Sequence, residues 1–302
     1  MRDFQTLKES VQVLMPKINF PEDSQIVFLN ALDQIIADAA SAKQLDMCLS
    51  CYDETTDCDY VQMLSDMKQL CEPLGIHEYT GNTLLFLCMA DKLRHRYSEQ
   101  GLPEHIFYDS MKDLTYKLDE CRLVRNILGT FVPKWYPGFF KLTRFALGRL
   151  QFEIVAFKED YVVDGVQLPA GSKAINLHIP RTGTRLYHDL VLEAYDLAAE
   201  FYKDVFGDDP IVFTCGSWML YPWIRTVLAP SSNMAAFYDD FTIVSWGEYE
   251  DYNQVWRLFD CTYTGDPDQL PQDSSLRRAF VQRIKQGEKI GWGKGVFIYR
   301  KS

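Results

Sequence analysis

The apolar positions of the first 140 residues recur at the spacing of α-helices. Ile26, Leu29, Leu32 and Ile36 fall on one face of a predicted helix that begins after Pro21. Similar faces follow at residues 84–89 and 106–118 and, less regularly, at residues 60–70. Alternation of apolar and polar residues is almost absent from this part. The pattern predicts a packed helical bundle over residues 1–140.

From residue 141 onward, short apolar runs and turn signals replace the helical period. Strands are predicted at 151–157, 174–179 and 211–215, and Asp164-Gly165 indicates a hairpin between residues 161–163 and 166–168. Residues 189–205 carry one apolar stripe, which predicts a helix. A strand, a helix and a strand in this order form a crossover between two parallel neighbouring strands. Further helices are expected at 219–228, 234–238 and 275–286, and further strands at 241–246, 256–263 and 295–299.

The predicted fold class is therefore α/β (α+β), with a helical domain over residues 1–140 and a mixed β-sheet domain flanked by helices over residues 141–302. The segment 131–140 is rich in proline and aromatic residues and is expected to pack between the two domains.

Composition restricts the class of protein. The chain has 302 residues, of which 47% are hydrophobic and 24% charged, as in ordinary globular proteins. A net charge of −11 argues against a nucleic-acid partner. No apolar leader and no run of about 18–20 apolar residues is present, so no membrane association is predicted. We expect a cytoplasmic protein whose eight cysteines are reduced.

A metal site is not predicted either. Cys48, Cys51 and Cys58 are close in sequence, but their neighbours are acidic and no second pair of cysteines or histidines follows at ligand spacing.

The segment after the first parallel strand has the composition of a phosphate-binding loop. Ligands of such folds bind where parallel strands end and helices begin. Arg181-Thr182-Gly183-Thr184-Arg185 offers two guanidinium groups, two hydroxyls and a glycine that lets backbone N–H groups approach an anion. An ordinary surface turn with solvated arginines is an equally good interpretation of the same residues.

Two ionisable residues lie on predicted strands. Glu153 stands within an apolar run, where a carboxylate needs a partner such as Arg149 or a role as a general base. His178 lies on the polar face of its strand and is a candidate to accept a proton from an amine, although a packed histidine is commoner.

The end of the second parallel strand carries further candidates. Cys215 and Ser217 are possible nucleophiles, but a buried cysteine and a helix-capping serine are the simpler interpretations. Tyr221 is a possible acid toward a leaving group.

Several of these segments together resemble a known family. They are residues 147–153, His178-Ile179-Pro180, Cys215-Gly216-Ser217-Trp218, Ser232-Asn233-Met234 and Gly291-Trp292-Gly293-Lys294-Gly295. The chain is similar to a bacterial family of two-domain acyltransferase-like proteins, which joins a helical N-acyltransferase N-terminal domain to a GNAT-like C-terminal domain. The resemblance covers nearly the whole chain and is strongest from residue 147 onward.

This resemblance implies an acyl donor, an acceptor of the acyl group, and the part of the sheet where the donor binds. The donor would be acetyl-CoA or another acyl-CoA, lying between strands 174–179 and 211–215. Its pyrophosphate would lie near Ile179 and the loop Arg181–Arg185, and backbone N–H groups of the first strand would polarise the thioester carbonyl. The acceptor would be an amine of a small molecule or peptide, which needs a base, and the leaving thiolate needs an acid.

Two other functions remain open. The CoA loop of such acyltransferases has the pattern Arg/Gln-x-x-Gly-x-Gly/Ala, whereas residues 181–185 contain one glycine in another register. A non-catalytic module that binds a small molecule or a protein in the same crevice is therefore the alternative. A serine or cysteine hydrolase is a third hypothesis, based only on Cys215 and Ser217. The sequence indicates neither the acceptor, the acyl length nor the oligomeric state.

Overall fold

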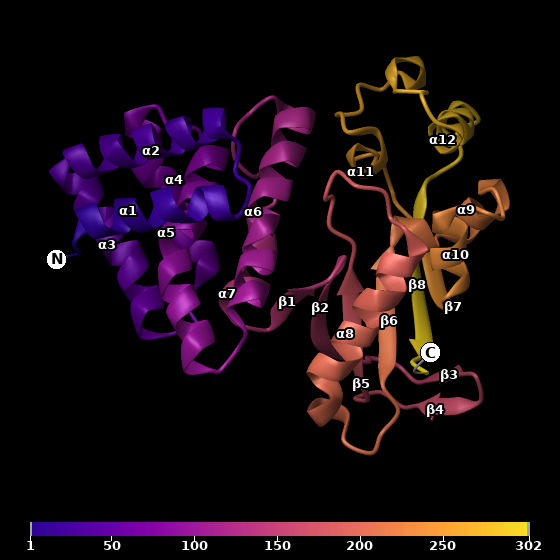
Figure 1. The fold of residues 1–302 in the computed structure, drawn as a ribbon. Helices are drawn as coiled ribbons and strands as arrows, with labels where there is room; N and C mark the ends of the chain where they lie inside the picture. The colour runs from indigo at the N-terminus through magenta and orange to yellow at the C-terminus, as the bar shows by residue number, and fades with distance from the viewer. Residues whose placement is uncertain (1, 301–302) are drawn as a thin grey trace. The chain divides into compact units, whose positions relative to one another are not determined.

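The computed structural model describes residues 2–300, in which the chain forms two compact units. The first runs to Ala146 and the second begins at Leu147 (Figure 1). The division therefore lies a few residues beyond position 140, where the helical pattern of the sequence ends. Each unit has its own architecture, helical in the first and mixed α/β in the second, as the sequence predicted.

The first unit is a bundle of helices around the long central helix α5. Its elements are α1 (Phe4–Lys17), α2 (Glu22–Ala37), α3 (Ala39–Glu54), α4 (Tyr60–Cys71), η1 (Glu72–Leu74), α5 (Glu78–Glu99), α6 (Glu104–Arg125), η2 (Pro133–Trp135) and α7 (Pro137–Phe140). Every residue of α5 from Thr80 to Ala90 is buried. A helix buried on all sides forms the core of its unit, and α5 packs against α1, α3, α4 and α6.

The buried face of α2 differs from the predicted one. Ile26 is exposed, whereas Phe28, Leu32 and Ile35 are fully buried. The ring of Phe28 packs edge-on against Phe20 at 5.2 Å between centroids. The buried stripe of α2 thus keeps Leu32 and excludes Ile26, which helical spacing alone did not reveal.

The aromatic segment 131–140 belongs to the core of the first unit. Tyr136, Phe139 and Phe140 are completely buried. The ring of Phe86 on α5 lies 4.6 Å from that of Tyr136 and 5.0 Å from that of Phe140. The density of aromatic residues in this segment is thus explained by packing within the first unit.

The main sheet is mixed and has the strand order β1-β2-β5-β6-β8-β7. The second unit contains it from β2 onward, whereas β1 crosses the division between the units. The strands are β1 (Arg144–Leu147), β2 (Leu150–Ala156), β5 (Lys173–His178), β6 (Val212–Ser217), β7 (Thr242–Glu248) and β8 (Gly291–Ile298). Strands β5 and β6 are parallel, and α8 (His188–Phe206) connects them, which confirms the predicted crossover. The pairs β2–β5, β6–β8 and β7–β8 are antiparallel.

The hairpin of β3 (Tyr161–Val163) and β4 (Val166–Leu168) forms a separate two-stranded sheet, with the predicted bounds. Its turn residues, Asp164 and Gly165, both have positive φ, at 51° and 78°. Two consecutive residues of this kind make the type I′ turn that Asp-Gly favours.

One face of the main sheet is covered by α8. The hydroxyl of Tyr202 donates to the carbonyl oxygen of Phe152 at 3.1 Å, and the ring of Tyr195 lies 5.3 Å from that of Phe213. Phe213 in turn stacks on Phe297 of β8 at 4.9 Å. These contacts fix which side chains of each strand face the core and which face the opposite side.

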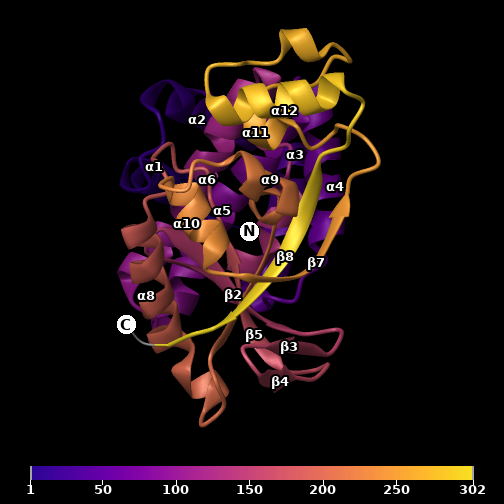
Figure 2. The same ribbon diagram turned by 90° about the vertical axis from the view of Figure 1, so that its right-hand side faces the viewer.

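Short helices fill the connections after β6 and β7. They are η3 (Trp218–Leu220), α9 (Pro222–Val227), α10 (Asn233–Asp239), α11 (Trp256–Phe259), η4 (Pro267–Gln269) and α12 (Ser275–Lys285). The helix predicted at 219–228 is interrupted at Tyr221 because the residue before a proline is disfavoured in the helical region. The segment between β7 and β8 carries α11, η4 and α12 and lies at the end of the sheet where β5 and β6 end (Figures 1 and 2).

The strand predicted at 256–263 is wrong. These residues form α11 and a loop, with Trp256 and Phe259 buried one helical turn apart. The helix ends because Asp260 adopts a left-handed conformation, with φ at 57°. A short run rich in aromatic residues fits the spacing of a helix and that of a strand equally well, so the sequence did not distinguish these two structures.

Residues 2–300 contain no helix with the length and apolarity that crossing a membrane requires.

Candidate functional site

The two parallel strands diverge at their carboxyl ends. β5 and β6 pair at Ile175 with Phe213 and at Asn176 with Thr214, and the described part of the chain shows no later pair between them. β5 nevertheless continues to His178, paired with β2, and β6 continues to Ser217, paired with β8. Each strand is thus held by its outer neighbour while the two separate from one another, which leaves unpaired strand edges facing across a gap.

A carboxylate, an amide and an imidazole lie together next to this gap. Glu153 of β2 is directly opposite Asn176 of β5, and His178 is two residues further on the same face. Glu153 Oε1 and His178 Nε2 are 2.8 Å apart, and Asn176 Nδ2 donates to Glu153 Oε1 at 3.3 Å. The side chains of His178 and Glu153 are 21% and 19% exposed, so both reach solvent.

This pair brings the two predicted proton-transfer residues into one site. Arg149, the partner considered for Glu153, donates to the carbonyl oxygens of Pro180 and Thr184. When His178 donates its Nε2 proton to Glu153, the lone pair of the neutral ring lies on Nδ1. A hydrogen-bonded carboxylate of this kind stabilises the imidazolium that forms when the ring accepts a proton.

Gly216 leaves open space beside the gap. It alternates on β6 with Thr214, which pairs with Asn176, so its missing side chain would point to the face of Glu153 and His178. A Cβ atom at Gly216 would meet no other atom within 4 Å, and the residue is exposed. No protein atom therefore fills the position that a side chain at Gly216 would take, next to the point where the two strands separate.

The loop between β5 and α8 turns at Gly183. Gly183 has φ at 79°, a conformation that favours glycine, and the hydroxyls of Thr182 and Thr184 are hydrogen-bonded at 2.8 Å. Arg185 is exposed. The N-cap residue of α8, Tyr187, makes no side-chain capping hydrogen bond. The start of α8 is anchored instead by His188, which lies 2.9 Å from Asp240.

Arg181 is engaged in an ion pair that the sequence did not suggest. Its Nε donates to Asp260 Oδ1 at 2.9 Å, and Arg277 of α12 donates to Asp260 Oδ2 at 2.7 Å. Asp260 is 79 residues away in sequence and follows α11, so neither spacing nor composition indicated this contact. The loop is thereby attached to the segment that carries α11 and α12.

Cys215 and Ser217 have the surroundings of structural residues. Cys215 is 1% exposed on the face covered by α8, and burial raises the pKa of its thiol to about 12. A thiol with such a pKa is almost entirely protonated at neutral pH and is a poor nucleophile. The hydroxyl oxygen of Ser217 accepts the N–H of Met219 at 3.1 Å, which makes Ser217 the cap of η3.

Tyr221 belongs to a polar network that reaches from the buried Arg283 to the exposed Glu248. Its hydroxyl donates to Glu248 Oε1 at 2.7 Å and accepts from Arg283 Nη2 at 3.0 Å. Burial first, and then the hydrogen bond to Glu248, raise the pKa of Tyr221 above its ordinary value. The hydroxyl proton of Tyr221 is thus held in a hydrogen bond to Glu248 of the same unit. Neither Glu248 nor Arg283 was a candidate from the sequence, because they lie on separate elements.

The glycines of β8 explain a further motif. Cβ atoms at Gly291, Gly293 and Gly295 would lie 2.3, 1.9 and 2.6 Å from neighbouring atoms, namely the carbonyl oxygens of Gly247 and Leu220 and the side chain of Phe241. The alternating glycines therefore let η3 and its surroundings lie directly on β8. Because η3 directly follows β6, this close packing also determines the path of the chain after the end of β6.

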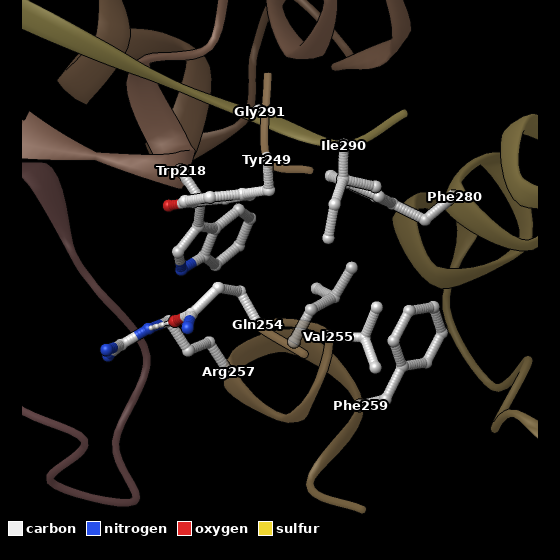
Figure 3. A pocket seen from close by; sticks show the side chains of 10 residues that line it. Trp218, Tyr249, Gln254, Val255, Arg257, Phe259, Phe280, Ile290 and Gly291 are labelled. Atoms are coloured by element: carbon white, nitrogen blue, oxygen red, sulfur yellow. Dashed lines mark hydrogen bonds between the residues drawn. The ribbon is translucent and has the colours of Figure 1, made fainter. Parts of the chain in front are cut away.

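A pocket with an apolar interior lies between η3 and the segment after β7 (Figure 3). The polar ends of Tyr249, Gln254 and Arg257 lie on one side, and Ile290, Phe259 and Phe280 form the other. The free space inside it is about 10 Å³, which is about enough for one water molecule. The complete lining is Trp218, Tyr249, Gln254, Val255, Arg257, Leu258, Phe259, Phe280, Ile290 and Gly291. Aromatic side chains fill most of this region, so a bulky ligand enters only if they move.

Within residues 2–300, no group of three or more histidine, cysteine or acidic side chains is arranged to hold a metal ion.

Comparison with known families matches both units. Residues 9–142 match the N-acyltransferase N-terminal domain, and residues 144–297 match the GNAT-like C-terminal domain. No curated protein sequence gives a significant match to the chain.

Solved structures of similar fold are acyltransferases. A mutant acyltransferase in complex with octanoyl-CoA is 20% identical, with a TM-score of 0.68 over 97% of this chain and 88% of that one. An acyltransferase in complex with decanoyl-CoA and teicoplanin is 20% identical, with a TM-score of 0.63 over 96% of this chain and 100% of that one. At this identity the likeness shows a shared fold across both units.

Proposed function

Because this chain belongs to the family that joins an N-acyltransferase N-terminal domain to a GNAT-like C-terminal domain, we propose that it transfers an acyl group from acyl-CoA to an amine. The acceptor is a small molecule or a peptide. The observation that carries the proposal is the divergence of β5 and β6 beside the hydrogen-bonded pair of Glu153 and His178. The structures of similar fold support the donor class, since they are complexes with octanoyl-CoA and decanoyl-CoA.

The donor in this proposal lies between the separated ends of β5 and β6. Its pantetheine arm occupies the open space at Gly216 and pairs with the strand edges there. Its pyrophosphate lies near Ile179 and the loop from Arg181 to Arg185, at the start of α8. Backbone N–H groups of β5 beyond Asn176 are suited to polarise the thioester carbonyl, because β6 does not pair with them.

The reaction needs one proton to be moved. The amine attacks the thioester carbon, the C–S bond breaks, and the amine loses a proton. His178, oriented by Glu153, accepts this proton and returns it to the departing thiolate, which leaves as CoA. The charge of Glu153 stabilises the imidazolium in the interval between the two transfers.

Calorimetric titration with acetyl-, octanoyl- and decanoyl-CoA tests the donor, and release of the CoA thiol with a panel of amines tests the transfer. Binding of one acyl-CoA together with amine-dependent thiol release supports the proposal. Binding without release by any amine favours the second function below.

A non-catalytic binding module is the second candidate, and the ion pair of Arg181 with Asp260 favours it. An arginine already paired offers less to a pyrophosphate, and the loop has one glycine where acyltransferase loops have more. Such a module would bind a small molecule in the gap between β5 and β6 without consuming it. Thiol release by wild-type protein that Glu153→Gln abolishes would exclude this function.

A further inference from the structure

Two cysteine thiols of the first unit are in direct contact. The Sγ atoms of Cys51 and Cys58 are 2.7 Å apart. A disulfide bond has about 2.05 Å between its sulfur atoms, so a small movement suffices to join them. The contact lies in the first unit, whereas the residues proposed for acyl transfer belong to the second.

The local chain path brings the two sulfur atoms together. Cys51 lies in the last turn of α3, and Cys58 lies in the loop just before α4. Thr55 caps α3 by donating its N–H to the carbonyl oxygen of Cys51 at 3.1 Å, and its own carbonyl oxygen accepts from Cys58 Sγ at 3.3 Å. Tyr60 closes the loop by donating its hydroxyl to the carbonyl oxygen of Thr56 at 3.0 Å. The loop is thus folded by its own hydrogen bonds into the shape that the contact requires.

The two thiols differ in accessibility in a way that suits stepwise oxidation. Cys51 is exposed, whereas Cys58 is buried behind it. An oxidant therefore meets Cys51 first and leaves Cys58 positioned to complete the bond.

The nearby Cys-x-x-Cys sequence does not supply the reacting pair. Cys48 is buried, and burial, followed by the charge of Asp66, raises the pKa of its thiol to about 11. The residue in sulfur contact with Cys51 is Cys58. Structure and sequence spacing therefore predict different partners for Cys51, which an experiment can distinguish.

We propose that Cys51 and Cys58 are a site of reversible disulfide formation, oxidised by a small disulfide such as glutathione disulfide. The Cys51 thiolate attacks glutathione disulfide, which forms a mixed disulfide and releases one glutathione. Cys58 then attacks the Cys51 sulfur, which forms the internal disulfide and releases a second glutathione. The protein loses two thiol protons and two electrons, and one glutathione disulfide is reduced to two glutathione molecules.

The bond would connect the end of α3 to the start of α4. Cross-linking a short loop restricts the unfolded chain and stabilises the folded one. We expect the thermal midpoint of the first unit to rise by about 5 °C on oxidation. Excess reductant should reverse this rise.

The test uses the full chain, equilibrated with glutathione disulfide and then alkylated and digested for mass spectrometry. The expected product is a peptide pair bridged between Cys51 and Cys58, with both cysteines alkylated after reduction. Cys51→Ser and Cys58→Ser should abolish the bridge and the rise in thermal midpoint. Cys48→Ala should retain both, since Cys48 takes no part. Cys51→Ser changes an exposed position and keeps the test valid if Cys58→Ser does not fold.

Three results would overturn the inference. In the first, both thiols remain free in excess glutathione disulfide. In the second, a mixed disulfide with glutathione persists at Cys51, which means that Cys58 cannot reach it. In the third, Cys51 is bridged to Cys48.

Discussion

The carboxylate of Glu153 on β2 and the imidazole of His178 on β5 are hydrogen-bonded, with Oε1 and Nε2 2.8 Å apart. Since each comes from a different strand, the pair exists only because β2 and β5 are in the register that places Glu153 opposite Asn176. It lies where β5 loses its pairing with β6. This position places the proposed proton-transfer pair next to the point where the two parallel strands separate.

Replacing Glu153 by glutamine should lower kcat for acyl transfer by about 100-fold or more, because general-base assistance contributes on the order of 10² to 10⁴. Glutamine keeps a hydrogen-bond acceptor near His178 but does not stabilise an imidazolium. The affinity for acyl-CoA should not change. Thiol-release kinetics and calorimetry measure the two quantities. Glu159→Gln, the same change at an exposed position, is the control, and equal rates for the two variants would refute the role of Glu153.

Arg185→Ala should weaken acyl-CoA binding by about 10-fold, since a hydrogen bond to a charged group contributes roughly 1.5–3 kcal/mol. A substitution of Arg181 would also break its ion pair with Asp260, so its effect on binding must be compared with that of a substitution of Asp260. If Arg181 contacts the donor, Arg181→Ala should weaken binding more than Asp260→Asn does. Equal effects of the two substitutions would mean that Arg181 only attaches its loop to the segment after α11. Lys158→Ala, at an exposed position, is the control for net charge.

Cys215 should not react with iodoacetamide in the native protein at pH 8. The pKa of its thiol is raised by burial to about 12, so the thiolate is scarce at every lower pH, and the side chain is 1% exposed. Mass spectrometry of native and unfolded samples gives the comparison, with the exposed Cys51 as an internal positive control. Rapid native labelling of Cys215 would instead support a cysteine nucleophile.

Gly293→Ala should destabilise the second unit by about 3 kcal/mol or more, because a Cβ there would lie 1.9 Å from the carbonyl oxygen of Leu220. Gly216→Ala offers a matched control, since a Cβ at Gly216 meets nothing within 4 Å. It should leave stability nearly unchanged. Denaturant unfolding of both variants is the measurement, and equal losses of stability would contradict the account of the β8 glycines.

Tyr221→Phe should destabilise the protein by about 1–2 kcal/mol, because it leaves Arg283 and Glu248 without their shared hydroxyl. The rate of acyl transfer per folded molecule should change little. A loss of kcat of about 100-fold without loss of stability would show that Tyr221 donates a proton to the leaving group.

Local sequence signals predicted much of the fold. Asp164-Gly165 placed the β3–β4 hairpin correctly, since both residues tolerate the positive φ of its turn. The long apolar stripe of α8 between two short strands gave the parallel pair β5–β6. Glu153 and His178 were singled out as ionisable residues on strands, but their contact depends on strand register, which the sequence did not provide.

The sequence-based predictions that were wrong or incomplete concern residues whose structure depends on contacts with distant parts of the chain. α11 was predicted as a strand because an aromatic-rich run has no clear period and its buried face is set by distant residues. The partner of Arg181 is 79 residues away, so the loop looked free when considered alone. Tyr221 is similar, because its partners lie on β7 and α12.

Calorimetric titration of octanoyl-CoA and acetyl-CoA into the wild-type chain and into Gly216→Val tests the central claim most directly. A Cβ atom at Gly216 meets no other atom within 4 Å, and a valine side chain there stands on the sheet face that carries Glu153 and His178, beside the point where β5 and β6 separate. The account predicts that the wild-type chain binds an acyl-CoA and that Gly216→Val, folded and equally stable, loses at least about 10-fold in affinity. No binding by the wild-type chain at millimolar donor, or equal binding by both proteins, would contradict it.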